Sequence, residues 1–174
     1  FDYQIAIGDL LAIFHSRMEE ISHPYLISNK SLEIDKIFHS FPNSKNFVGI
    51  SWRSLSEMYH SERSYALEDL CKSLNKNEDA LVVLQPLATE EEILKLRSLG
   101  FTVITNFDCL NDIDSVFSLI SNCNKVISIA NSVVHFSGAL GINTTLLLPK
   151  IPSWRWGVNK HRSDLYPSIE YKTL

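Results

Sequence analysis

The sequence predicts an α/β domain built on a Rossmann-like, doubly wound parallel sheet of about six strands. Short apolar runs alternate with longer amphipathic segments, which is the pattern of consecutive βαβ units with right-handed crossovers. The apolar runs are nearly continuous, as in Ala80–Gln85, and strands buried on both faces of a parallel sheet have this composition. Ligands of such sheets bind at the carboxyl ends of the strands, so the loops there are the candidate functional segments.

The first 30 residues show no clear period, and we expect them to form an arm or interdomain segment. A Rossmann-like domain is then expected over residues 31–174. Within the arm, Asp9–Met18 has the apolar spacing of a short helix. Ser31 is predicted to cap the first helix of the domain, which ends near His39 before a turn.

Strands and helices alternate regularly after this turn. Strands are predicted by the apolar runs at 47–52, 80–85, 101–105, 126–129, 144–148 and 168–171. Helices are predicted at 64–74, 89–99, about 112–121 and 132–141, and their N-cap candidates are Ser64, Thr89 and Asp112 or Asp114. Gly100 follows the second of these helices, as a left-handed C-terminal cap would.

The stretch Lys125–Pro149 carries the clearest binding signal. A buried β-branched strand ends at Ala130, and either Asn131 or Ser132 is a good N-cap for the helix that follows. The first amides of a helix lack intrahelical partners, and the helix dipole is positive at this end. The stretch therefore predicts an anion site, most often used for phosphate, at the amides of Val133, Val134 and His135.

Composition limits the function classes. Of the 174 residues, 45% are hydrophobic and 21% are charged, which is ordinary for a globular protein. The formal net charge of −4 argues against a general nucleic-acid binder, since that activity needs a basic face. No apolar run approaches the roughly 18 residues of a membrane span. The first residue is Phe1 and no signal-peptide pattern follows, so we expect a piece of a longer protein or a processed product.

Cysteine and histidine usage gives no sign of a disulfide frame or a metal site. Three cysteines without CxxC spacing indicate free thiols in a reducing compartment, and therefore a cytoplasmic protein. The six histidines show no HxH or HxxxH pairing. The GxGxxG, GxxxxGK[ST] and GxSxG motifs are also absent, which argues against a dehydrogenase, a P-loop NTPase and an ordinary α/β-hydrolase.

Several segments resemble the family 9 glycosyltransferases of the ADP-heptose:lipopolysaccharide heptosyltransferase type, particularly bacterial members fused to tetratricopeptide repeats. Ser132–Gly141, SVVHFSGALG, resembles the family's SVAHLAGALG segment. Leu146–Trp156 is similar to LLLPxxPDWRW, and Arg162–Ser168 is similar to RxSPWYPS. Two further segments match more weakly. Phe1–Gln4 is similar to the family's lead-in to that domain. Val48–Trp52 together with Arg63–Ser64 is similar to the family's VGLxW…RS pattern.

The resemblance implies the C-terminal, sugar-nucleotide-binding half of a two-domain glycosyltransferase B architecture. It places the donor diphosphate on the segment from Asn131 to His135, and the nucleoside near Gln85, Asn106 and Asp112. The donor would be an ADP-, UDP- or GDP-sugar used as substrate, with no cofactor. The acceptor, a glycan, a lipid-linked molecule or a protein, is undetermined, and its half of the enzyme, or a repeat domain, is expected outside this chain. A cytoplasmic location, free or peripheral to the inner face of the membrane, is expected.

Without a metal ion, preorganised amides and cationic side chains must meet the charge that grows on the leaving diphosphate. Arg63 is the first candidate for this basic partner and Arg53 is the second. Arg155 could reach the phosphate or only the surface, and Trp154 could stack on the base or cover the edge of the sheet.

Structural alternatives stand beside several of these roles. His135 could be a packed histidine, and Asp112 is first of all a helix cap. Trp156, like Trp154, more readily covers the sheet edge, while Gly138 is expected to allow close packing of its helix.

Two departures from the family pattern affect function. Ala130-Asn131 replaces the family's Asp-Thr, whose aspartate faces the donor sugar, and the loop after Trp52 lacks the usual glycine and asparagine. The presumed general base belongs to the acceptor half. The predicted function is donor binding for a metal-independent, inverting glycosyltransferase. The alternatives are a catalytically degenerate nucleotide- or protein-binding domain, and an epimerase-like enzyme of the same architecture.

Overall fold

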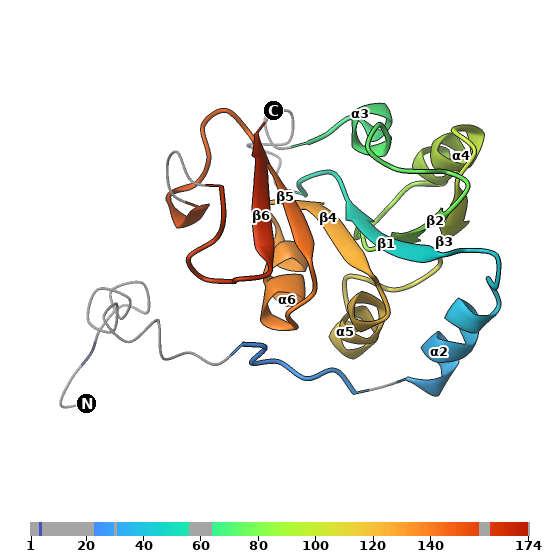
Figure 1. The fold of residues 1–174 in the computed structure, drawn as a ribbon, viewed down its shortest axis with the longest axis horizontal. Coiled ribbons are helices and arrows are strands. Elements are labelled where there is room, and N and C mark those ends of the chain that lie inside the picture. Colours follow the sequence, from blue (N-terminus) through green and yellow to red (C-terminus); the bar gives the residue numbers. More distant parts are fainter. Residues whose placement is uncertain (1–3, 5–22, 30, 56–63, 157–160, 174) are drawn as a thin grey trace.

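The computed structural model describes residues 4, 23–29, 31–55, 64–156 and 161–173 of the chain (Figure 1). The helix predicted over Asp9–Met18 lies outside the described residues, and so does Arg63. The division of the chain at residue 30 stays a prediction.

The core of the molecule is a six-stranded sheet in which every pairing is parallel, in the order β3-β2-β1-β4-β5-β6. This arrangement confirms the predicted α/β, Rossmann-like fold. Because the chain leaves β3 at one edge and returns beyond β1, the strand order reverses between β1 and β4. The strands are β1 (Asn46–Ser51), β2 (Asp79–Val83), β3 (Thr102–Ile104), β4 (Lys125–Ile129), β5 (Thr144–Leu148) and β6 (Ile169–Thr173).

Helices cover both faces of the sheet (Figure 1). One face carries the short helix α3 (Leu67–Cys71) and α4 (Glu90–Ser98); α4 packs beside β3, and α3 packs beside α4. The other face carries α5 (Ile113–Ser121) and α6 (Ser132–Ala139), and α2 (Leu32–His39) packs beside α5. A 3₁₀ turn, η4 (Trp154–Trp156), follows β5.

Burial on both faces explains the continuous apolar runs of the strands. In β2 and the residue after it, Leu81 and Val83 pack toward α3 and α4, while Ala80, Val82 and Leu84 pack toward α2 and α5. All five side chains are at most 4% exposed. A third cluster joins α6, β5 and β6 around one tryptophan and one tyrosine; its buried members are Val134, Ala139, Leu146, Leu148, Trp156, Tyr166 and Ile169. Trp156 thus covers this part of the sheet, as predicted.

Most predicted caps are present. Ser31 and Asp112 accept amide hydrogen bonds at the starts of α2 and α5, and Thr89 forms a complete capping box with Glu92 at α4. Gly100 follows α4 with a positive φ of 94°, the left-handed conformation that its lack of a side chain permits.

The prediction for α3 was wrong in length and in its cap. The helix begins at Leu67 after Ala66, whose side chain makes no capping hydrogen bond. Ser64 Oγ instead accepts a hydrogen bond from the amide of Ser54 at 3.4 Å, and so joins the two arms of the loop after β1. Smaller corrections apply to the bounds of other elements: α6 stops at Ala139, β1 at Ser51 and β2 at Val83, β3 covers only Thr102–Ile104, and β6 covers Ile169–Thr173.

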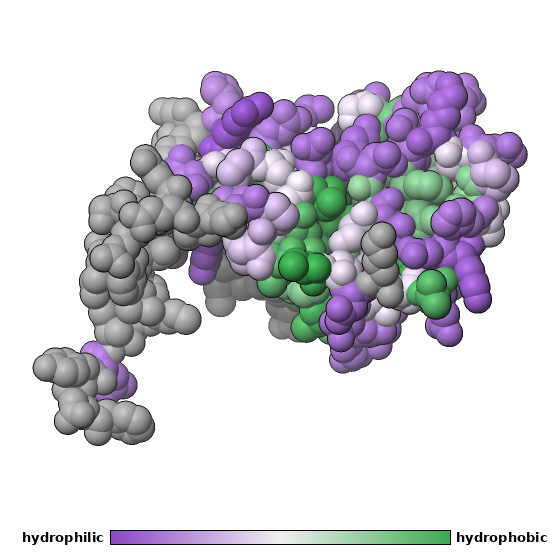
Figure 2. Space-filling view, turned by 60° about the horizontal axis from the view of Figure 1, so that its bottom comes forward, coloured by the Kyte–Doolittle hydropathy of each residue, from purple (hydrophilic) through white to green (hydrophobic). Residues whose placement is uncertain are grey.

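Residues 23–29 run along the helical face on which α6 and α5 lie, toward α2 (Figure 1). The amides of Tyr25 and Leu26 both donate to the carbonyl oxygen of Ala139, each at 3.1 Å, at the end of α6. Leu26 packs against the core beneath it, whereas Ile27 is 90% exposed. On this side of the molecule a hydrophobic area is surrounded by polar residues (Figure 2).

The three cysteines, Cys71, Cys109 and Cys123, are free thiols, as predicted. Burial raises the pKa of Cys123 to about 12 and that of Cys109 to about 11, so both stay protonated and unreactive near neutral pH. In the described part of the chain, the helices are too short or too polar to cross a bilayer.

Candidate functional site

The candidate site lies where the strand order reverses, at the carboxyl ends of β1 and β4. The residue that links the two strands is Asn131, the N-cap of α6. Its Oδ1 accepts from the amide of Val133 and from the hydroxyl of Ser128, both at 3.0 Å, and its Nδ2 donates to Ser51 Oγ at 2.7 Å. Because Ser51 ends β1, these bonds hold the start of α6 at a fixed place beside β1.

The amino end of α6 offers backbone donors to a ligand. The side chain of Asn131 occupies the amide of Val133, which the sequence alone had predicted to be available. The amides of Ser132 and Val134 have no acceptor among the described residues. Ser132 is exposed whereas Val134 is 0% exposed, so the accessible donor of this helix end is the amide of Ser132, and anion binding there stays a prediction.

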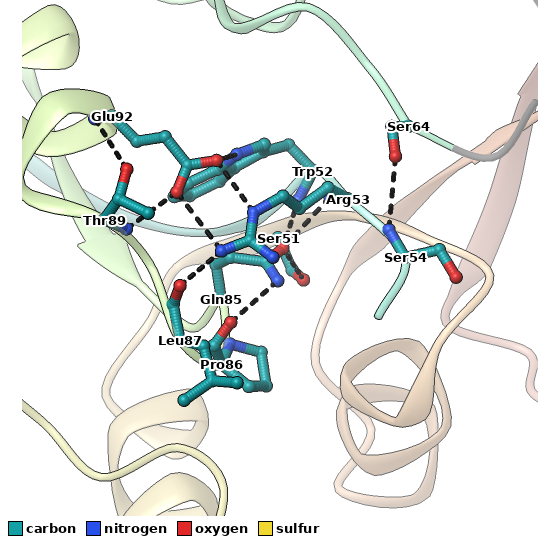
Figure 3. A network of polar contacts seen from close by, with 10 residues as sticks. All are labelled: Ser51, Trp52, Arg53, Ser54, Ser64, Gln85, Pro86, Leu87, Thr89 and Glu92. Carbon is teal, nitrogen blue, oxygen red and sulfur yellow. Dashed lines mark hydrogen bonds and ion pairs between the residues drawn. The ribbon is translucent and has the colours of Figure 1, made fainter. Parts of the chain in front are cut away.

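Gln85 is a structural anchor for the loop after β1 (Figure 3). Its Oε1 accepts from the amides of Trp52 and Arg53, both at 3.0 Å, and from Ser51 Oγ at 3.1 Å. Its Nε2 donates to the carbonyl oxygen of Pro86, and the residue is only 3% exposed. A nucleoside contact by Gln85 stays a prediction. The side-chain oxygen of Gln85 already accepts three hydrogen bonds within the protein.

Arg53, the second candidate for a phosphate contact, points to the start of α4 (Figure 3). Its Nε forms an ion pair with Glu92 Oε1 at 2.8 Å, and its Nη2 also donates to the carbonyl oxygen of Leu87. The indole Nε1 of Trp52 donates to the same carboxylate at 2.8 Å. The charge of Arg53 is therefore matched by Glu92 in a largely buried pair.

The pKa of Glu92 gives a pH-dependent prediction. Burial acts to raise this pKa, but hydrogen bonds from Arg53, the Thr89 amide and Trp52 outweigh it, and the net pKa lies below the usual value. A depressed native pKa stabilises the fold above the unfolded-state pKa of about 4.3 and loses that contribution as the pH falls. We expect the Arg53→Met variant to lose less stability than the wild type between pH 6 and pH 3, as measured by urea unfolding. Equal pH slopes in the two proteins would contradict this role for the pair.

A pocket of about 230 Å³ lies at the carboxyl ends of β2 and β3. Gln85 and Asn106, two of the predicted nucleoside-binding residues, both line it. Asn106 is exposed and has a positive φ of 77°, which turns the chain immediately after β3. Apolar side chains also line the pocket, with Leu87 at 64% and Leu110 at 49% exposed on its rim.

Asp112 does not line this pocket, although it was predicted to lie near the nucleoside. Its carboxylate accepts from the amide of Ser115 at 3.0 Å and from the Ser115 hydroxyl at 2.5 Å. These two hydrogen bonds lower the pKa of Asp112. The structure therefore shows the capping role, and the ribose contact stays a prediction.

His135 is packed among aromatic side chains in the first turn of α6. Its ring stacks on Trp156 with centroids 5.0 Å apart, and its Nδ1 lies 3.1 Å from the hydroxyl of Tyr166. Burial of the His135 ring lowers its pKa, and the positive charge of Arg155 lowers it further. Arg155 itself is exposed in η4. Of the described cations considered for phosphate binding, Arg155 is thus the one beside the first turn of α6. Trp154 lies in the same 3₁₀ turn, but its side chain is outside the described residues.

Some residues that shape the site carry no sequence signal of their own. Ser51 looks like any polar end of a buried strand, and Glu92 looks like an acidic residue placed at a helix start for the dipole. Tyr166 belongs to a segment that was noticed only through its resemblance to the family. Within the described residues, no group of three or more His, Cys, Asp or Glu side chains could hold a metal ion.

Gly138 is placed as the sequence predicted. A Cβ atom at this position would lie 2.5 Å from Cγ of Tyr166 and 2.7 Å from Cδ1 of Ile169. The absence of a side chain therefore lets the residues before and within β6 approach α6 closely.

No protein-family model matches the sequence, and no curated protein matches it. Among solved structures, the fold is similar to the crystal structure of the glycosyl transferase family 9 from Veillonella parvula DSM 2008, with a TM-score of 0.55 and 13% sequence identity. The similarity covers 88% of this chain and 43% of that chain. This chain therefore has a Rossmann-like α/β fold that is shared with part of a glycosyl transferase family 9 structure and is consistent with one half of a glycosyltransferase B architecture.

Proposed function

We propose that this chain is the donor-binding domain of a glycosyltransferase that uses a nucleoside-diphosphate sugar without a metal ion. The observation that carries the proposal is the placement of an anion-binding helix end and a pocket along one edge of the sheet. The fold similarity to a glycosyl transferase family 9 structure and the resemblance of Ser132–Gly141 to that family's segment support it.

The geometry suits a nucleoside diphosphate. In the sheet order, β4 and β2 are separated by β1, and two strand spacings amount to about 10 Å. A diphosphate on the amide of Ser132 at the start of α6 could therefore extend across β1 and place its nucleoside in the pocket beside Asn106. The pocket walls carry amide groups, apolar side chains and the carboxylate of Asp108, and no lysine or arginine lines it among the described residues, which suits a base and ribose better than a phosphate.

Arg155 is the proposed cationic partner of the diphosphate among the described residues. When a glycosyl group leaves, negative charge grows on the β-phosphate, and a cation near the helix end stabilises it. Because Arg53 is paired with Glu92, its charge is less available for this role. The acceptor site and the general base would belong to the second half of the enzyme, and the acceptor could be a glycan, a lipid-linked molecule or a protein.

Isothermal titration of the purified chain with ADP, UDP and GDP tests the proposal. We expect at least one of them to bind at millimolar concentration or tighter, and the Arg155→Ala variant to bind it about tenfold more weakly, a loss of about 1.4 kcal/mol. The matched control is Lys172→Ala, because Lys172 lines a different pocket with Tyr65 and Asp69. No binding of any of the three nucleotides would overturn the proposal.

Ala130 favours a second candidate function, a domain that binds a nucleotide without transferring a sugar. The residue is half-buried and packs against the cluster around Trp156, at the position where the resembled family has an aspartate that faces the sugar. A comparison of affinities for a nucleoside diphosphate and for its sugar conjugate separates the two functions. A transferase domain should gain affinity from the sugar, whereas equal affinities and no glycosyl transfer by the full-length protein would favour the second function.

A further inference from the structure

Two tyrosine hydroxyls form a hydrogen-bonded chain that ends on His135. Tyr25 Oη donates to Tyr166 Oη at 3.4 Å, and Tyr166 Oη lies 3.1 Å from Nδ1 of His135. Tyr166 precedes β6 and is only 8% exposed, while Tyr25 comes from the segment that runs along the helical face of the domain. This chain of hydrogen bonds therefore connects Tyr25 to His135, which lies 110 residues later in the sequence, in the first turn of α6.

The direction of these hydrogen bonds decides which nitrogen of His135 carries the proton. Because Tyr25 donates to Tyr166, the proton of Tyr166 is available for Nδ1 of His135. In the opposite arrangement, Nδ1–H would donate to the oxygen of Tyr166 and the Tyr166 hydroxyl would donate to Tyr25, so the two arrangements differ in the tautomer of His135. Burial also raises the pKa of Tyr166, which keeps this hydroxyl protonated.

The imidazole is held in one orientation by packing. Its ring stacks on Trp156 at an interplanar angle of 26° and meets the ring of Tyr166 at 66°, with centroids 5.8 Å apart. Burial, followed by the charge of Arg155, lowers the pKa of His135, so the ring is neutral near pH 7. A neutral ring whose Nδ1 accepts must carry its proton on Nε2, which has no partner among the described residues.

We propose that Tyr166, supported by Tyr25, is a positioning residue that fixes His135 in the Nε2–H form, so that the ring donates a hydrogen bond to the anion at the amino end of α6. This inference rests on the proposed function, because the anion is the diphosphate of the donor. It adds a neutral side-chain donor to the backbone amide of Ser132 and to the cation of Arg155.

The proposal also makes residues 23–26 part of the nucleotide site. The backbone of Tyr25 and Leu26 is bound to the end of α6 through Ala139, and the hydroxyl of Tyr25 supports the start of the same helix through Tyr166 and His135. Because binding free energies are reciprocal, a nucleotide that uses His135 favours the docked position of this segment, and the docked segment favours the nucleotide.

Two-bond ¹H–¹⁵N correlation spectra of the imidazole, recorded on ¹⁵N-labelled protein, test the positioning. The wild-type spectrum should show the Nε2–H form of His135, and Tyr166→Phe should shift it toward the Nδ1–H form or a mixture. Tyr25→Phe should act in the same direction with a smaller effect. Tyr65→Phe is the matched control, since Tyr65 lines the pocket that also includes Asp69 and should leave the spectrum of His135 unchanged. An Nδ1–H form in the wild type, or an unchanged spectrum in Tyr166→Phe, would overturn the proposal.

Titration with the nucleoside diphosphate that binds most tightly tests the role in recognition. Affinity should fall about fivefold to tenfold in Tyr166→Phe, and the loss should disappear for the corresponding nucleoside, which has no phosphate. An unchanged affinity for the diphosphate would show that Tyr166 does not position His135 for it and would also overturn the proposal. If the wild type binds no diphosphate, the proposed function fails, whereas the spectra still decide whether Tyr166 positions His135.

Discussion

Replacing Gln85 with leucine should lower the free energy of unfolding by about 3 kcal/mol or more. The substitution removes the one oxygen that accepts from Ser51 Oγ and from the amides of Trp52 and Arg53, in a site that is 3% exposed. Each buried donor left without an acceptor costs about 1–3 kcal/mol, and the apolar side chain recovers only part of this loss. The effect is therefore among the largest expected for any single substitution in the chain.

Urea unfolding followed by far-ultraviolet circular dichroism measures this loss. Asn77→Leu is the matched control, because Asn77 is an exposed turn residue and its change should stay within about 0.5 kcal/mol. Gln85→Glu keeps an acceptor oxygen for the same three donors and should be less destabilised than Gln85→Leu at neutral pH. If the leucine variant were as stable as the wild type, Gln85 would not be the anchor of this loop.

The role of Gln85 bears on function as well as on stability. The loop that it holds begins with Trp52 and Arg53, and Ser51 connects the same network to Asn131 at the start of α6. The carboxyl ends of β2, β1 and β4 are thus joined by one set of side-chain hydrogen bonds. A ligand that spans these three strands meets a preformed surface, which lowers the entropy lost on binding.

Local sequence signals were sufficient for the fold and for the helix end in the site. The five apolar residues from Ala80 to Leu84 predict a strand buried on both faces, and their side chains do pack alternately against α3–α4 and α2–α5. The sequence predicted an N-cap at either Asn131 or Ser132 after a β-branched run, and the structure shows that Asn131 caps α6. In both cases the decisive interactions are made within a few residues or by a simple repeating pattern.

The partners of the charged and polar site residues could not be predicted in the same way. Arg53 looked like a phosphate ligand because it follows β1, but only the parallel pairing of β1 with β2 brings it to Glu92, 39 residues later. Ser64 has the preferred side chain of an N-cap, yet its hydroxyl is used by Ser54 across the loop. The partner of such a side chain depends on which residues the tertiary fold brings beside it. A local sequence pattern does not contain this information.

Replacing Gly138 with valine should destabilise the domain by about 3 kcal/mol or more, because α6 has no room for a side chain at this position. A Cβ would lie 2.5 Å from Cγ of Tyr166, and this ring atom is attached directly to the Cβ of its own residue. The ring therefore cannot move away without a shift of the backbone before β6. Overpacking of this kind costs about 1–3 kcal/mol for small additions, and the two further methyl groups of valine add to it.

Gly49 provides the comparison for this steric effect. A Cβ there would lie 2.6 Å from Cδ1 of Leu84, which is the end of a flexible side chain and can rotate away. Chemical denaturation should therefore show a smaller loss for Gly49→Ala than for Gly138→Ala, even though alanine improves the intrinsic helix propensity at residue 138 by about 1 kcal/mol. The reverse order would contradict the steric explanation.

A double-mutant cycle connects the packing at Gly138 to the site. In a Tyr166→Ala background the ring is gone and only Cδ1 of Ile169 still obstructs a Cβ, so Gly138→Ala should cost less stability, and the coupling between the two positions should exceed about 1 kcal/mol. The ring that obstructs a side chain at residue 138 also carries the hydroxyl bound to His135. A Gly138→Ala protein that remains folded should therefore also bind a nucleoside diphosphate more weakly, because the close approach that Gly138 permits is what brings Tyr166 to the first turn of α6.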